Sequence, residues 1–207
     1  MSESLLGEDG ALAAGGRVGL VMSSVGAEAM ERLAARTPAG AVLLDAPILG
    51  NPAGAEAGTL IVPLAGPAAA KAEAAPLLAT FAESVVDLGE EPGTAQAVKA
   101  VSQQLQVLGM VAAIEAISLA RARGVDEEQM LAIVAATEPT WASRNFEYAK
   151  GLWQQGDPGS SLGLFAKDLG AAVDDAAAVG VEMPLAEQAL RLLRARLEGA
   201  PRDEEQA

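Results

Sequence analysis

The sequence predicts an α/β fold followed by an all-α domain with one long central helix. Up to about residue 90, short apolar runs bounded by Gly or Pro alternate with segments of helical spacing. After Gly93 the spacing is helical throughout, and the stretch from Thr94 to Arg123 contains no proline. We therefore expect a first domain over residues 1–90, an all-α domain over residues 91–198 and an acidic, unpacked tail over residues 199–207.

The first domain is expected to alternate strands and helices in the order β-α-β-β-α-β. Strands are predicted over residues 17–23, 41–46, 59–64 and 84–88, and helices over residues 25–36 and 67–81. The first two strands are apolar along most of their length, which is typical of a parallel sheet covered on both faces. Ser24 is expected to N-cap the first helix, and Pro63 limits the third strand to a short or edge position.

The all-α domain begins with the segment from Thr94 to Arg123, which would extend for roughly 45 Å as a helix. Further helices are predicted over residues 126–134, 141–153, 164–178 and 184–197, with residues 157–159 as a loop. Asp126 is expected to N-cap the first of these.

The composition excludes several classes of function. The 28 acidic residues against 14 basic ones give a formal charge of −14, which argues against binding to nucleic acid or to an anionic membrane. Because the chain has no histidine and no cysteine, a Ser-His-Asp triad, a cysteine nucleophile and the usual zinc sites are excluded, and no metal site is expected. Proton chemistry is left to Lys, Asp, Glu or Tyr148. We find no signal peptide or transmembrane segment and expect a cytoplasmic protein.

The long predicted helix carries a polar face beside an apolar stripe. Lys99, Ser102, Gln103 and Gln106 are spaced i, i+3, i+4 and i+7, which places them on one side of a helix. A partly buried lysine amine near a helix start is suited to general acid/base catalysis, and a nearby amide side chain can orient a substrate hydroxyl or carboxylate. The alternative is a solvated polar face on which the lysine amine extends into water.

Two further segments carry candidate binding residues. Residues 45–60, DAPILGNPAGAEAGTL, place Gly50 and Asn51 just beyond the carboxyl end of a predicted parallel strand. Ligands bind at such ends in α/β folds, and exposed backbone N–H groups there can hold a carboxylate; the alternative is an ordinary strand-to-helix turn. Residues 165–180, FAKDLGAAVDDAAAVG, place Lys167 and Asp168 near the start of a helix, where the lysine either faces an anionic ligand or pairs with its neighbours.

These three segments, in this order, resemble the β-hydroxyacid dehydrogenase family, which is related to 6-phosphogluconate dehydrogenase. The resemblance runs from about Gly7 to Leu193. DAPILGNPAGAEAGTL is similar to the family's substrate-binding signature, GTAQAVKAVSQQ (residues 93–104) to its catalytic-lysine segment, and FAKDLGAAVDDAA to its late Lys-Asp segment. The resemblance implies that the first domain is a partial Rossmann-like, dinucleotide-binding domain. It also implies an NAD(P)-dependent oxidoreductase that transfers hydride reversibly between NAD or NADP and a small hydroxyacid or semialdehyde.

The resemblance also implies a role for each candidate residue. Lys99 would be the general acid/base. The substrate would be bound by Leu49, Gly50, Asn51, Ser102 and Gln103, and the cofactor side would hold Ser24, Lys167 and Asp168. Association through the helical domain into a homodimer or homotetramer is expected as well.

The chain departs from the family pattern in three places. Leu49-Gly50-Asn51 stands where the family has Ser-Gly-Gly, so one hydroxyl contact to the acid is lost, and Ser102 stands where an Asn is common. No Gly-x-Gly-x-x-Gly turn follows a strand, so the pyrophosphate cradle of a complete Rossmann domain is absent. Two explanations stay open: an enzyme incomplete at its amino end, or a non-catalytic relative that keeps the helical domain as a dimerisation module and does not bind NAD(P).

Overall fold

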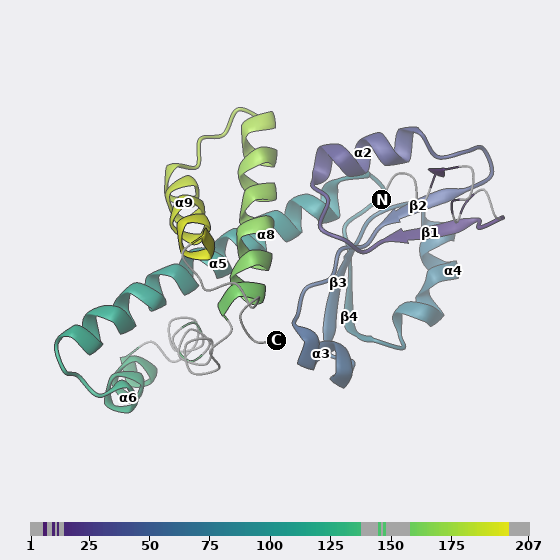
Figure 1. Ribbon diagram of the computed structural model, residues 1–207. Coiled ribbons are helices and arrows are strands. Elements are labelled where there is room, and N and C mark those ends of the chain that lie inside the picture. The colour runs from purple at the N-terminus through teal and green to yellow at the C-terminus, as the bar shows by residue number, and fades with distance from the viewer. Residues whose placement is uncertain are drawn as a thin grey trace, which may run out of the picture. The chain divides into compact units, whose positions relative to one another are not determined.

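The computed structural model describes residues 6–7, 10, 12, 15–137, 145, 147 and 158–198. The chain divides into two compact units, Met1–Val101 and Ser102–Ala207. The first, here called the α/β unit, contains all the described strands, and the elements described in the second, the helical unit, are helices (Figure 1).

The described strands of the α/β unit form two parallel pairs. β1 (Val18–Val21) pairs with β2 (Val42–Asp45), and β3 (Leu60–Leu64) pairs with β4 (Ala82–Asp87). Isolated antiparallel bridges from Asp45 to Ala65 and from Leu49 to Ile61 join the end of β2 and the segment after it to β3. The intervening helices are α2 (Ala27–Ala35), α3 (Pro52–Ala57) and α4 (Ala68–Leu78). The predicted parallel strands are therefore confirmed.

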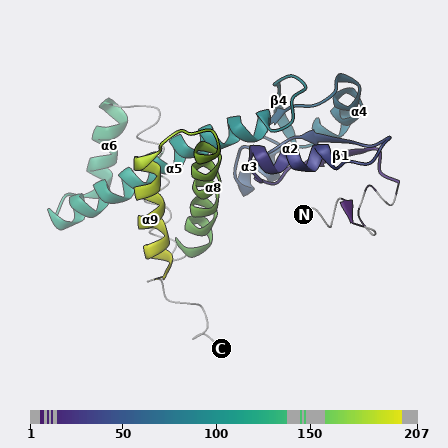
Figure 2. The same cartoon turned by 90° about the horizontal axis from the view of Figure 1, so that it is seen from above.

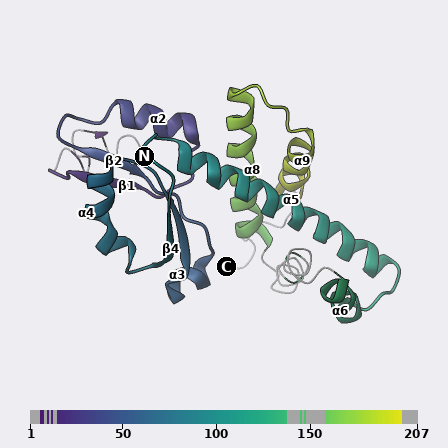
Figure 3. The same ribbon diagram turned by 180° about the vertical axis from the view of Figure 1, so that it is seen from behind.

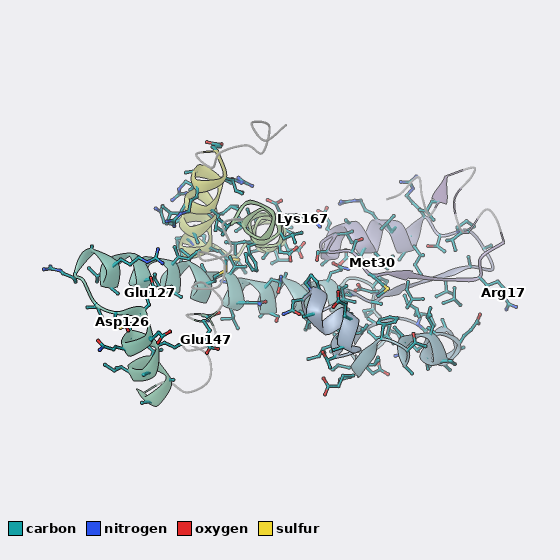
Figure 4. The ribbon with its side chains drawn as sticks, turned by 60° about the horizontal axis from the view of Figure 1, so that its bottom comes forward. Arg17, Met30, Asp126, Glu127, Glu147 and Lys167 are labelled. Carbon is teal, nitrogen blue, oxygen red and sulfur yellow. The ribbon has the colours of Figure 1, made fainter. Side chains whose placement is uncertain are left out.

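Strand β2 is buried on both of its faces. Its side chains alternate, so Leu43 packs with Met30 and Leu33 of α2, whereas Leu44 packs with Ala74 and Leu78 of α4. The two helices cover opposite faces of the sheet (Figure 1), and the Met30 side chain points from α2 toward the strands (Figure 4). This double cover is the reason that the AVLLDA run is almost wholly apolar.

The long helix α5 (Thr94–Ala122) starts in the α/β unit and continues into the helical unit. There it is followed by α6 (Glu127–Thr137), α8 (Pro158–Ala178) and α9 (Pro184–Glu198), of which α8 and α9 form a helical hairpin (Figures 2 and 3). The core of this unit is built from buried side chains of α5, α8 and α9, among them Met110, Ile117, Leu169 and Leu193. The predicted all-α second part is confirmed.

Most predicted helices lie within a few residues of the observed ones, but two starts are different. Ser24 does not cap α2, because the helix begins after Gly26 and receives no side-chain cap. Helix α8 begins at Pro158, inside the segment expected to be a loop, since a proline in the first turn removes no needed hydrogen bond and already has a helical φ. The predicted helix over 141–153 and the tail over 199–207 lie outside the described residues apart from two helical positions, Asn145 and Glu147.

Among the described helices, α5 is long and apolar enough to cross a membrane by length and composition alone. This differs from the expectation that no segment meets that test. The core helix of a soluble protein meets it too, and Met110 and Ile117 of α5 are buried against α8 and α9. Gln96 and Lys99 on the same helix are also buried with hydrogen-bond partners, whereas Val101, Leu105 and Leu119 are more than half exposed.

The packing of α8 predicts a sharp contrast between two of its leucines. Leu169 is completely buried, whereas Leu164 is 61% exposed. We expect Leu169→Ala to lower the free energy of unfolding by about 2–5 kcal/mol because it leaves a cavity in the core. Leu164→Ala, the matched control, should change it by about 0.5 kcal/mol or less. Urea denaturation followed by circular dichroism measures both; equal losses would contradict this core.

Candidate active site

Lys99 lies inside the α/β unit rather than on a solvated helix face. Its residue is only 9% exposed, and its Nζ donates a hydrogen bond of 2.7 Å to the carbonyl oxygen of Ile48. Ile48 follows β2 and belongs to the segment predicted to bind the substrate. The amine is thereby held beside the carboxyl end of a parallel strand, the location at which α/β folds place their ligands.

The segment after Ile48 is held by its own backbone. Leu49 N–H donates to the Ile61 carbonyl at 2.8 Å, and the Leu49 carbonyl accepts from Ile61 N–H at 2.9 Å. Asn51 Oδ1 caps α3 by accepting from Gly54 N–H at 2.8 Å. Between them Gly50 is exposed, with φ of 140°, and a Cβ there would come within 2.5 Å of a Leu60 methyl group. Within the described residues, the Gly50 N–H donates to no acceptor, as a group that receives a ligand would.

Asp45, the last residue of β2, is a completely buried carboxylate. Its Oδ2 accepts hydrogen bonds from three backbone N–H groups at the start of α5: Gly93 at 2.9 Å, Ala95 at 3.0 Å and Gln96 at 3.3 Å. Its Oδ1 is buried and has no hydrogen-bond partner among the described residues. A carboxylate from a distant strand thus satisfies the N–H groups that every helix start leaves unpaired.

The pKa of the Asp45 carboxyl lies above its ordinary value of 3.8. Burial raises the pKa because it penalises the charged form, and the hydrogen bonds from Gln96, Ala95 and Gly93 lower it only in part. The unpartnered Oδ1 is consistent with this balance, since a buried carboxylate oxygen without a donor has lost its hydration without replacement.

Gln96 joins the start of α5 to the loop between β1 and α2. Its side chain is 2% exposed; Nε2 donates to the Ser23 carbonyl at 3.1 Å, and Oε1 accepts from Val25 N–H at 3.0 Å and Gly26 N–H at 3.4 Å. Ser24, which is half-buried, lies within the loop that this side chain holds. Gln96 therefore takes the place that sequence analysis gave to Ser24 as the partner of the N–H groups before α2.

Sequence reasoning missed Asp45 and Gln96 as site residues. A signal was present for Asp45, because a single acidic residue in an otherwise apolar strand needs hydrogen-bond donors once the strand is buried. For Gln96 the sequence offered no such signal, since a glutamine near a helix start is ordinary on an exposed surface.

The remaining predicted site residues lie in the helical unit. Gln103 is buried, and its Nε2 donates to the half-buried Asp168 Oδ2 at 2.6 Å, so α5 and α8 share a polar contact at the margin of the core. Ser102 is half-buried, and Lys167 is exposed on α8 (Figure 4). The pairing of Gln103 with Asp168 brings together two residues that the sequence assigned to the substrate side and the cofactor side.

The described residues contain no group of three or more acidic side chains that could hold a metal ion.

Comparisons with known proteins match both parts of the chain. Residues 93–207 match the family described as NAD-binding of NADP-dependent 3-hydroxyisobutyrate dehydrogenase, and residues 2–89 match the NAD binding domain of 6-phosphogluconate dehydrogenase. The chain belongs to the β-hydroxyacid dehydrogenase family. The resemblance stated from the three sequence segments is thus confirmed.

Individual relatives agree with this assignment. An L-threonate dehydrogenase of Escherichia coli O6:H1 is 32% identical over 197 residues, which cover 93% of this chain and 65% of the relative. The NAD-dependent L-serine dehydrogenase of Pseudomonas aeruginosa is 31% identical, covering 91% and 66%. The crystal structure of a 3-hydroxyisobutyrate dehydrogenase from Salmonella typhimurium has a TM-score of 0.83 at 28% identity, covering 96% of this chain and 70% of that one. The chain spans about two thirds of the length of these relatives.

The family implies NAD(P), but the turn after β1 does not fit the phosphates of such a cofactor. Holding the phosphates of a dinucleotide requires a turn of unpaired backbone N–H groups after a strand. At the turn after β1, Val25 N–H and Gly26 N–H donate to Gln96 instead. The sequence contains no Gly-x-Gly-x-x-Gly. The N–H groups of Val25 and Gly26 are therefore not available to a phosphate.

The raised pKa of Asp45 predicts how stability depends on pH. Because the folded chain binds this proton more tightly than the unfolded chain, the cost of the charge is absent below 3.8, grows as the pH rises and is complete above the raised pKa. We expect the free energy of unfolding of Asp45→Asn minus that of the wild type to become more positive across this window. Urea denaturation at intervals of about one unit, from about pH 4 to about pH 8, measures the difference.

Asp87→Asn is the matched control, because Asp87 also ends a parallel strand. The hydrogen bond from Lys71 holds the pKa of the exposed Asp87 below 3.8, so its pH dependence lies at lower pH and has the opposite sign. Above about pH 5 the Asp87→Asn difference should stay constant. A constant Asp45→Asn difference over the same range would contradict the burial of a titrating carboxyl.

Proposed function

We propose that the chain supplies the proton-transfer and substrate-binding part of an NAD(P)-dependent oxidoreductase that acts on a small hydroxyacid or semialdehyde. The observation that carries this proposal is the buried Lys99 amine, held at the end of β2 by the carbonyl of Ile48. The family supports the reaction class, since both matching models describe NAD-binding domains of dehydrogenases. We also propose a cytoplasmic location, in keeping with the expectation from the sequence.

In this proposal Lys99 is the general acid/base. When the hydroxyacid is oxidised, its hydroxyl proton passes to the neutral amine while the carbon–oxygen bond becomes a carbonyl; in the reverse direction the ammonium returns the proton to the oxygen. The nicotinamide, when bound, supplies or accepts the hydride. The Ile48 carbonyl accepts one N–H of the amine, which fixes the direction of its other N–H bonds and its lone pair.

The substrate carboxylate would be held by the segment after Ile48. Gly50 is exposed, its N–H donates to no acceptor among the described residues, and its φ of 140° favours glycine. Leu49 contributes an apolar side chain where a hydroxyl is usual in the family, and Asn51 uses its side-chain oxygen on α3. We therefore propose a short acid with fewer polar groups near the carboxylate than a substrate that needs a serine contact.

Family correspondence gives the remaining proposed roles. Gln103 and Ser102 would orient the substrate, and Ser24, Lys167 and Asp168 would lie on the cofactor side. The hydrogen bond from Gln103 to Asp168 supports a common function for these two residues, because each fixes the rotamer of the other.

The test of the proposal is the substitution of the amine. L-Threonate, L-serine and 3-hydroxyisobutyrate, the compounds in the names of relatives, are assayed with NAD and NADP in the full chain. We expect Lys99→Ala to lower kcat by about 10²–10⁴ and to leave KM within a few fold, as is typical when a general acid/base is removed. Lys71→Ala, which removes a lysine paired with Asp87 in the same unit, is the control and should have no effect. Turnover retained by Lys99→Ala, or none by the wild type with any of these pairs, would contradict the proposal.

A second candidate function is association through the helical unit without catalysis. It is favoured by an apolar groove of about 340 Å³ between α5 and α9, lined by Val111, Ile114, Leu192, Leu193, Ala195 and Arg196. Leu192 at this groove is 43% exposed. Exposed apolar side chains beside an apolar groove are typical of a surface that binds another helix.

Sedimentation equilibrium tests the association. We expect a dimer or tetramer in the wild type and weaker association in Leu192→Glu by about tenfold or more, because the substitution places a charge in an apolar contact. Leu77→Glu, at a leucine of α4 that is 55% exposed in the α/β unit, is the matched control and should associate as the wild type does. A monomeric wild type would exclude this function.

A further inference from the structure

We infer that Asp45 is a positioning residue for the Lys99 amine: its buried carboxylate holds the first turn of α5 and so sets where the amine meets the Ile48 carbonyl. The inference deepens the proposed function and rests on it, because positioning matters only if Lys99 acts on a substrate.

The Asp45 carboxylate holds the start of α5 through hydrogen bonds. Asp45 Oδ2 accepts hydrogen bonds from the N–H groups of Gly93, Ala95 and Gln96, so one oxygen atom holds three donors at the start of α5. A negative group at the positive end of a helix is stabilising, and burial strengthens the interaction because little water screens it. The carboxylate thus fixes both the position and the rotation of α5 relative to β2.

The Lys99 amine is borne by the same part of α5 that Asp45 holds. Lys99 follows Gln96 by three residues in the same helix, so its side chain leaves α5 about one turn after the capped N–H groups. Ile48 follows Asp45 by three residues on the other side of the contact. The Asp45 cap and the bond from Lys99 to Ile48 are therefore two adjacent ties between the same two segments, and releasing the first loosens the second.

The same turn of α5 also binds the loop after β1. Gln96 donates its own N–H to Asp45 while its side chain holds Ser23, Val25 and Gly26. The carboxylate therefore fixes the residue that fixes this loop. One buried group at the end of β2 organises the loop after β1, the segment after β2 and the start of α5.

The experiment measures the accessibility of each lysine amine in the full chain. An amine-acylating reagent is applied under native conditions, and mass spectrometry gives the labelling rate at Lys99, at the exposed Lys167 and at Lys71. In Asp45→Ala we expect labelling of Lys99 to accelerate about fivefold relative to Lys167, the factor that corresponds to the loss of a helix cap. Asp45→Asn keeps an acceptor oxygen, so labelling of Lys99 should accelerate only roughly twofold relative to Lys167, which is a partial rescue.

Asp87→Ala is the matched control, since this carboxylate pairs with Lys71 at the end of β4. It should accelerate labelling of Lys71 and leave Lys99 unchanged. Amide hydrogen exchange at Val25 and Gly26 is the second measurement and should accelerate in Asp45→Ala.

Unchanged labelling of Lys99 in Asp45→Ala would overturn the inference, as would equal acceleration at all lysines, which indicates general loss of stability. If Asp45→Ala does not fold, Asp45→Asn decides: protection of Lys99 equal to that of the wild type overturns the inference. Failure of the proposed function has a different signature, namely turnover that survives Lys99→Ala while the labelling pattern stays as expected.

Discussion

A carboxylate buried at the end of β2 holds the first turn of α5, and the candidate site is arranged around that contact. Asp45 has given up its hydration, and three N–H groups of the helix start replace only part of it. Such a residue is costly for stability, as its raised pKa shows. In return, the position of the helix start is well defined, because hydrogen bonds to a charged group are directional whereas apolar packing is not.

Most polar groups around the site hold the backbone and so are not available to a ligand. The Leu49 backbone pairs with Ile61, the Asn51 oxygen caps α3, and Gln96 occupies the N–H groups before α2. The proposed chemistry is therefore assigned to the Lys99 amine and the Gly50 N–H. A rigid surrounding frame is what a proton-transferring amine needs, since small displacements of a catalytic group cost large factors in rate.

The two parts of the chain depend on different forces. In the α/β unit, the order of strands is fixed by apolar side chains on both faces of β2, and buried hydrogen bonds then place the loops at its end. In the helical unit, leucine, isoleucine and alanine side chains of α5, α8 and α9 fill the core, and the hydrogen bond from Gln103 to Asp168 is a polar contact at its margin. Each part of the chain matches its own domain family: residues 2–89 match one family and residues 93–207 match the other.

The sequence by itself determined the succession of elements and indicated Lys99 as a candidate for the chemistry. Apolar periodicity and glycine or proline boundaries are local properties, so the strands, the long helix from Thr94 and the candidate Lys99 could be found without coordinates. Only the tertiary structure decided that Gln96, and not Ser24, satisfies the N–H groups before α2, and that Asp45 caps a helix 48 residues away. Such partners are chosen by proximity after folding, and the spacing of residues along a chain does not encode which distant donor a buried acceptor meets.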